Sequence, residues 1–161
     1  MILRLTEPEV LRHPALASWL DAVCTKLERP HAPAYIIDLC AKPDTLVLLG
    51  IEAQKPRALL VLQPPSPLTL YPIITLGYNS GSALLGKSMM DAAATWCGQQ
   101  GSAFCHAVNG SGASDAAYER CGRRCGWSVV DRQTFITFAV PQELNDGPAV
   151  DTRTRLGLPA T

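Results

Sequence analysis

The chain has 161 residues, of which 47% are hydrophobic and 17% charged, and its 14 basic side chains are balanced by 14 acidic ones. This composition excludes an intrinsically disordered chain, and the balanced charge excludes a global basic field that would attract nucleic acid or an anionic membrane. The length predicts one domain with a sizeable hydrophobic core.

The opening segment and the cysteines indicate the setting of the protein. No stretch approaches the roughly 18 apolar residues that a bilayer-spanning helix needs, and the first ten residues, which include Arg4, lack the apolar run of a signal peptide. The six cysteines lie mostly within apolar patterns and are interpreted as small buried residues of a reducing compartment. They show neither a CxxC spacing nor a His pair, so we predict no metal site. We expect a cytoplasmic protein with no membrane partner.

The first forty residues predict one short strand and two helices. The opening MILRLT is typical of a short strand. A helix is then predicted from about Ala15 to Pro30, because its apolar residues recur at helical spacing: Leu16, Leu20, Val23 and Leu27. The segment AYIIDLCAKP predicts a second short helix that ends at Pro43.

Three strand candidates follow. TLVLLGIEA (residues 45–53) and RALLVLQP (residues 57–64) are joined by QKP, which favours an antiparallel hairpin. The third candidate, residues 68–78, contains Pro72. A proline there indicates an edge strand, a bulge, or a strand that begins at Ile73.

The second half of the sequence predicts a long helix over residues 84–98, a strand over 102–109, a helix over 114–122, and a last strand or bent strand pair over 127–140. Residues 141–161 show no periodicity and are interpreted as a tail, either mobile or laid along a partner. We therefore assign one domain to residues 1–140 and an irregular C-terminal tail to residues 141–161.

The order of these elements resembles the layout of the GNAT (GCN5-related N-acetyltransferase) superfamily. Two segments carry the resemblance. GKSMMDAAATWC is similar to the start of the family's long central helix, and NGSGASDAAYERCG is similar to a family pattern through Asn109, Ala116 or Ala117, Tyr118 and Gly122. The resemblance implies an α/β (α+β) fold with a mixed, mostly antiparallel twisted sheet flanked by helices. The strand over residues 102–109 should then lie parallel to the third strand of the antiparallel set.

In that family, the turn before the long helix binds the pyrophosphate of acetyl-CoA or another acyl-CoA, with backbone N–H groups at a helix N-terminus meeting the anion. The resemblance implies that the cofactor-binding residues here are Gly81, Ser82, Ala83, Gly86, Lys87 and Asn109. The family pattern is Gln or Arg, two residues, Gly, one residue, then Gly or Ala. Anchoring it on Gly86 places Gly81 at the basic position and Leu84 at the middle glycine, so only the last position fits. The alternative is an ordinary strand-to-helix junction, where Asn, Ser and Gly also prevail.

Acetyl transfer to an amine benefits from an acid that protonates the leaving thiolate and from a base that deprotonates the ammonium. The resemblance implies that Tyr118 is the catalytic acid, while the alternative is a half-buried core tyrosine. The family's carboxylate near the end of the third antiparallel strand is absent, and Glu52 and His106 are the candidate substitutes.

Three functions remain open. The first is an acyl-CoA-dependent N-acyltransferase with weak or lost activity, acting on a small-molecule or protein amine. The second is a non-catalytic structural or assembly protein on a GNAT-like fold, for example a phage virion component, with protein partners bound through its tail. The third is a small NTPase, because residues 81–88 satisfy GxxxxGKS.

Overall fold

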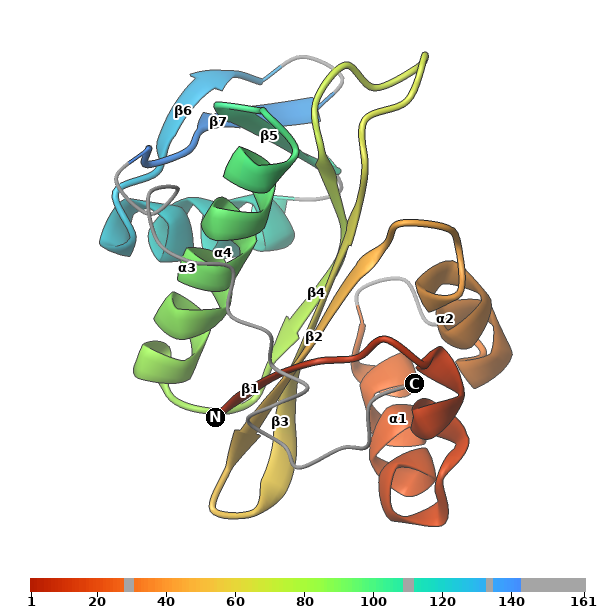
Figure 1. The fold of residues 1–161 in the computed structure, drawn as a ribbon. Helices are drawn as coiled ribbons and strands as arrows, with labels where there is room; N and C mark the ends of the chain where they lie inside the picture. The colour runs from red at the N-terminus through yellow and green to blue at the C-terminus, as the bar shows by residue number, and fades with distance from the viewer. Residues whose placement is uncertain (28–30, 109–111, 133–134, 143–161) are drawn as a thin grey trace.

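The computed structural model describes residues 1–27, 31–108, 112–132 and 135–142 (Figure 1). Two expectations from the sequence, the cofactor contact of Asn109 and the tail beyond Gln142, lie outside these residues. A seven-stranded sheet runs through the described part, with the strands in the order β1-β2-β3-β4-β5-β7-β6. The strands are β1 (Ile2–Arg4), β2 (Leu46–Glu52), β3 (Lys55–Gln63), β4 (Ile73–Asn79), β5 (Phe104–Val108), β6 (Ser128–Asp131) and β7 (Phe135–Ala139).

Helices cover both faces of this sheet. They are the short 3₁₀ helix η1 (Pro8–Arg12), α1 (Pro14–Lys26), α2 (Pro33–Cys40), α3 (Ala83–Gln99) and α4 (Gly112–Arg124). All neighbouring strands are antiparallel except β4 and β5, which are parallel and joined through α3. The predicted fold class and the predicted parallel neighbour of β4 are therefore confirmed.

Alternation along the central strands divides the core into two clusters. α1 and α2 lie on one side of the sheet, and α3 and α4 on the other (Figure 1). Val47, Leu49, Leu59 and Val61 join the cluster that contains residues of α1 and α2, whereas Leu46, Leu48, Leu60 and Leu62 join the cluster that contains residues of α3. Strands buried on both faces read as continuous apolar runs, as β2 and β3 do here.

The β2–β3 hairpin turns one residue earlier than the sequence predicts. Its two turn residues are Ala53 and Gln54, with φ of 49° and 62°, and Lys55 and Pro56 already belong to β3, with Glu52 paired to Lys55. Positive φ at both central residues is the geometry of a type I′ turn, whose twist matches that of the flanking strands. The turn places Glu52 at the tip of the hairpin.

Strand β4 begins directly after Pro72, which is one of the three alternatives left open by the sequence. Val61 pairs with Leu76 and Leu62 pairs with Ile74, so Thr75 is a bulge residue with no direct partner on β3. Within the described residues, β4 and β5 pair only at Ile73–His106 and Ile74–Ala107. Because a bulge bends its strand, β4 leaves β5 immediately beyond these pairs. We call this branch point the fork.

Candidate active site

A cavity of about 300 Å³ lies along the part of β4 beyond the fork, on the side of the sheet that carries α3 and α4. Its walls come from β3, β4, α3 and α4 and are mostly apolar. The residues that line it are Ala58, Leu59, Leu60, Gly77, Tyr78, Asn79, Gly86, Met89, Met90, Ala117, Tyr118 and Cys121. Two residues predicted from the sequence, Gly86 and Tyr118, therefore meet in one cavity.

Tyr118 is half-buried on α4 and packs toward β4. A Cβ atom added to Gly77 would lie 2.8 Å from the Tyr118 hydroxyl oxygen and 3.1 Å from its ring carbon Cε1. Glycine at this position of β4 therefore leaves the space that the phenol occupies. The structure brings the predicted acid to the cavity, and its catalytic role remains a prediction.

The loop between β4 and α3 is held by hydrogen bonds within the chain. Ser80 donates to the Arg57 carbonyl through both its backbone N–H (2.8 Å) and its hydroxyl (2.9 Å). The Gly81 N–H donates to Asn79 Oδ1 at 2.8 Å. Ser82 is the N-cap of α3, since its hydroxyl oxygen accepts from the Leu85 N–H at 3.1 Å.

Glu52, at the tip of the β2–β3 hairpin, accepts two hydrogen bonds from this loop. Its Oε1 accepts the Ser82 N–H at 2.7 Å, and its Oε2 accepts the Ser82 hydroxyl. The hydroxyl bond, then the N–H bond, holds the pKa of the Glu52 carboxyl below its ordinary value. A carboxylate of the chain itself thus occupies the N-terminus of α3. The sequence offered Glu52 only as a substitute base. The missing signal was the turn at Ala53 and Gln54, which directs Glu52 toward this loop.

The other residues of the predicted pyrophosphate loop that the structure describes do not line the cavity. Gly81 is enclosed, because an added Cβ would collide with Glu52 Oε1 and lie 2.8 Å from Leu85 Cδ2. Ala83 is the first residue of α3. The family pattern has glycine at the position of Leu84. Leu84 is 72% exposed and lines a separate groove between α3 and strands β1 and β2. Its side chain therefore points away from the cavity.

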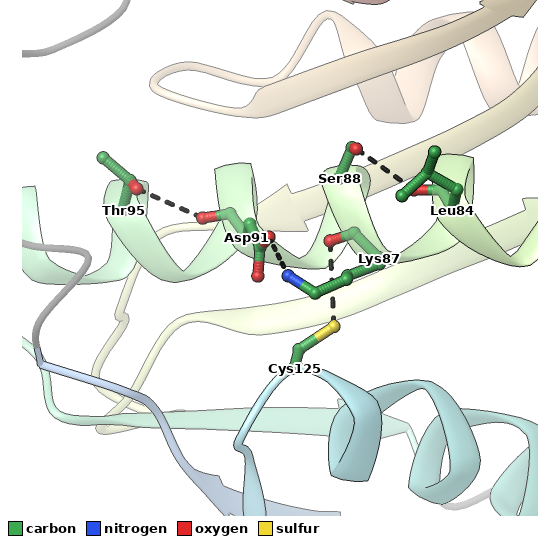
Figure 2. Close-up of polar contacts among 6 residues, drawn as sticks. All are labelled: Leu84, Lys87, Ser88, Asp91, Thr95 and Cys125. Carbon is green, nitrogen blue, oxygen red and sulfur yellow. Dashed lines mark hydrogen bonds and ion pairs between the residues drawn. The ribbon is translucent and has the colours of Figure 1, made fainter.

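Lys87 lies on α3 one residue beyond Gly86 but is not part of the cavity lining. Its Nζ is 2.7 Å from Asp91 Oδ2, and its carbonyl accepts a long contact (3.7 Å) from Cys125 Sγ (Figure 2). Gly86, Lys87 and Ser88 are all helical, and the Ser88 hydroxyl donates to the Leu84 carbonyl at 3.0 Å. The GxxxxGKS match is therefore not a phosphate loop, because the helix begins before its second glycine.

His106 lies at the fork on the opposite face of the sheet. Its neighbours Cys105 and Ala107 are buried on the side of α3, so alternation turns the imidazole the other way. His106 Nδ1 is 2.9 Å from the Thr137 hydroxyl, and the Tyr71 ring centre is 5.2 Å away. Partial burial lowers the pKa of His106, while Asp131 acts in the opposite direction. The neutral imidazole is thus the prevailing form at pH 7.

No protein-family model and no curated protein sequence matches the chain. Solved structures do match it. An aminoglycoside 6'-acetyltransferase type Ii superposes with a TM-score of 0.61 at 12% identity, covering 86% of this chain and 95% of the other. An aminoglycoside 6'-N-acetyltransferase from Enterococcus faecium gives a TM-score of 0.61 at 9% identity over 86% and 95%. An aminoglycoside acetyltransferase in complex with coenzyme A and kanamycin gives 0.60 at 13% identity over 89% and 95%. The chain has the GNAT fold.

Within this GNAT fold, the described residues add two facts about reactive groups. No three His, Cys, Asp or Glu side chains among them come together as metal ligands. All six cysteines are free thiols, of which Cys121 is half-buried and the other five are buried. Because Cys121 lines the cavity, its reactivity reports on whether the cavity is filled. No helix in the described part of the chain is long and apolar enough to span a membrane.

Proposed function

We propose that the chain is an N-acyltransferase that moves an acyl group from a pantetheine thioester, such as acetyl-CoA, to the amine of a small molecule. The observation that carries the proposal is the cavity at the fork, which is lined by Tyr118 and bordered by the part of β4 beyond the bulge. Support for the substrate classes comes from a structural neighbour in complex with coenzyme A and kanamycin.

The donor arm has a natural place along β4. Beyond Thr75 this strand pairs with β3, and its other edge has left β5. An extended ligand with amide groups can bind to such an edge as an added strand. The pantetheine arm has two amides and no charge, which suits a cavity whose walls are mostly apolar.

In the proposed reaction, the base and the acid lie on opposite faces of the sheet: His106 on the face of α1 and α2, and Tyr118 on the face of α3 and α4. His106 accepts a proton from the acceptor ammonium, directly or through water, and the free amine attacks the thioester carbonyl carbon. The new C–N bond forms and the C–S bond breaks, and the leaving sulfur takes the proton of the Tyr118 hydroxyl. The nitrogen loses its excess proton as the amide forms, and that proton returns to the Tyr118 phenolate through water. Positioned acids and bases of this kind contribute about 10²–10⁴-fold each.

An acceptor would approach from the face that carries α1 and α2. Trp19 of α1 and Tyr78 of β4 form an edge-to-face pair there, with ring centres 6.4 Å apart. Aromatic rings attract an ammonium group before it loses its proton. This pair, on β4 beyond the residues that pair with β5, favours a cationic small-molecule amine.

The test compares wild type with Tyr118→Phe, and the matched control is Tyr35→Phe, because Tyr35 of α2 is exposed. We expect Tyr118→Phe to lower kcat about 100-fold and to leave donor affinity unchanged, since a thioester binds before the thiolate forms. We expect kcat/KM of wild type to fall on the acid side, at a pH below the ordinary imidazole value because burial lowers the pKa of His106, and His106→Gln should remove this fall.

A second candidate, a non-catalytic assembly protein, is favoured by the internal hydrogen bonds of the β4–α3 loop, which use groups that a phosphate would need. The two candidates are separated by the rate at which N-ethylmaleimide alkylates Cys121. Protection of Cys121 by S-acetylpantetheine or acetyl-CoA supports the enzyme. If neither ligand protects Cys121 or raises the melting temperature at millimolar concentration, the proposed enzyme is wrong.

A further inference from the structure

The N-terminus of α3 is where a GNAT fold would meet the diphosphate of acetyl-CoA, and here it already holds an anion. The Ser82 N–H and hydroxyl both donate to the Glu52 carboxylate, and the Gly81 N–H is turned onto Asn79. A helix N-terminus stabilises one nearby negative charge through its dipole and its unpaired N–H groups. Here the negative charge that the N-terminus of α3 stabilises is the carboxylate of Glu52.

The charges around Glu52 strengthen the effect. Arg57 and the N-terminal ammonium of Met1 are the cations whose fields favour the ionised carboxylate, and the ammonium also donates to the Ile51 carbonyl at 2.8 Å. Both positive charges are therefore partly neutralised by Glu52. Lys87, the nearest basic residue on α3 in sequence, is paired with Asp91. A diphosphate would meet a carboxylate in place of a free cationic site.

The cavity beside the fork is not affected by this arrangement. Glu52 does not belong to its lining, which is formed by β3, β4, α3 and α4. The two parts of a CoA molecule would thus meet opposite conditions: an open apolar cavity for the pantetheine arm, and an occupied, negatively charged loop for the diphosphate.

We propose that Glu52 is a specificity-determining residue that directs the protein toward acyl thioesters whose pantetheine arm carries no diphosphate. This inference rests on the proposed function, since it concerns the donor of the same reaction. Two sources share this chemistry: a free pantetheine thioester, and a phosphopantetheine thioester carried on a protein, whose single phosphate diester is the only charge at the end of the arm.

The experiment measures dissociation constants and kcat/KM for three donors: acetyl-CoA, S-acetylpantetheine and an acetylated phosphopantetheinyl carrier protein. The proteins are wild type, Glu52→Gln and Glu52→Ala. Asp44→Asn is the matched control, because it removes the same charge beyond the other end of β2, at a position with φ of 58° that asparagine accepts. Cys121 alkylation gives a second measure of binding that does not depend on turnover.

We expect wild type to bind S-acetylpantetheine at least as tightly as acetyl-CoA. Glu52→Ala should bind acetyl-CoA about tenfold more tightly than wild type, because it frees the Ser82 N–H and leaves Arg57 unbalanced. Glu52→Gln, which loses the charge but keeps the shape, should fall between the two. Affinity for S-acetylpantetheine should stay unchanged in every variant, and Asp44→Asn should behave as wild type.

The outcomes separate this inference from the proposed function. If wild type binds acetyl-CoA more than tenfold tighter than S-acetylpantetheine, or if Glu52→Ala leaves that ratio unchanged, Glu52 does not select the donor although the enzyme stands. If no donor binds to any variant, both the function and the inference are wrong. A higher kcat/KM for the carrier protein than for S-acetylpantetheine supports the inference and identifies the protein-borne source.

Discussion

The cavity at the fork and the loop before α3 share strand β4 and helix α3, yet the cavity presents a mostly apolar surface to a ligand and the loop presents a carboxylate. In the cavity, Gly77 lacks a side chain, and the Tyr118 ring, which lines the cavity, fills the space that it leaves. In the loop, Gly81 also lacks a side chain, and the space is taken by Glu52 and Leu85. At both positions the glycine makes room for another side chain, but only at Gly77 does that side chain, Tyr118, line the cavity.

The difference arises from distant parts of the chain. The cavity depends on the bulge at Thr75, which separates β4 from β5. The loop depends on the hairpin tip, where the turn at Ala53 and Gln54 carries Glu52 to Ser82, 30 residues along the chain. Substitutions in the two regions should therefore have separable effects.

The largest effect is expected for Gly77→Ala. The added methyl group would lie 2.8 Å from the Tyr118 hydroxyl oxygen, so the ring must move and the cavity must shrink. Overpacking of this kind costs about 1–3 kcal/mol in the free energy of unfolding, which urea denaturation measures. We also expect S-acetylpantetheine to lose its protection of Cys121.

The control for this substitution is Gly86→Ala, which adds one methyl group to the helical wall of the same cavity. Its nearest contact would be Asn79 Nδ2 at 3.0 Å, the end of a side chain, and alanine is about 1 kcal/mol better than glycine within a helix. Gly86→Ala should therefore be neutral or stabilising. Equal destabilisation by both substitutions would show that Gly77 has no special relation to Tyr118.

A smaller effect is expected for Ser82→Ala in the loop. It removes the N-cap of α3 and one of the two bonds to Glu52, and loss of a serine cap costs about 1 kcal/mol in the free energy of unfolding. Ser88→Ala is the matched control, since the Ser88 hydroxyl bonds back to the Leu84 carbonyl within the helix (Figure 2). Replacing that residue by alanine should cost nothing.

The same Ser82→Ala variant tests whether the loop and the cavity are independent. Its affinity for S-acetylpantetheine should equal that of wild type, because Ser82 does not line the cavity. A loss of affinity as large as that of Gly77→Ala would show that the loop shapes the cavity, and the contrast between the two regions would fail.

Much of the fold could be predicted because local patterns determine it. Apolar residues at helical spacing marked α1 and α3, and continuous apolar runs marked β2 and β3. The crossover through α3 predicted that β5 would be parallel to β4. The hairpin turn was placed one residue late, since Gln54, Lys55 and Pro56 look like a turn, whereas the chain adopts positive φ at Ala53 and Gln54.

The site was predicted less completely, because its decisive contacts join residues far apart in the sequence. Tyr118 was placed by its resemblance to a family pattern, and it does reach the cavity. No local pattern indicated that Glu52 would cap α3, or that Leu84 would point into another groove. An arginine at position 81, where the family pattern has Gln or Arg, would meet Glu52, Leu85 and Arg57, whose atoms lie nearest to Gly81.

The smallest effect is expected for Lys87→Gln, although the sequence placed Lys87 among the cofactor-binding residues. Its ammonium is paired with Asp91 on the side of α3 that faces Cys125 (Figure 2), and it does not line the cavity. Exposed i,i+4 pairs contribute little to stability, and glutamine keeps the helix propensity of lysine. We therefore expect the melting temperature to remain at the wild-type value. The affinities for acetyl-CoA and S-acetylpantetheine should stay within about twofold of wild type. A tenfold loss of acetyl-CoA affinity alone would show that Lys87 leaves Asp91 to bind the diphosphate. The loop would then be a working anion site despite Glu52, and the contrast with the cavity would disappear.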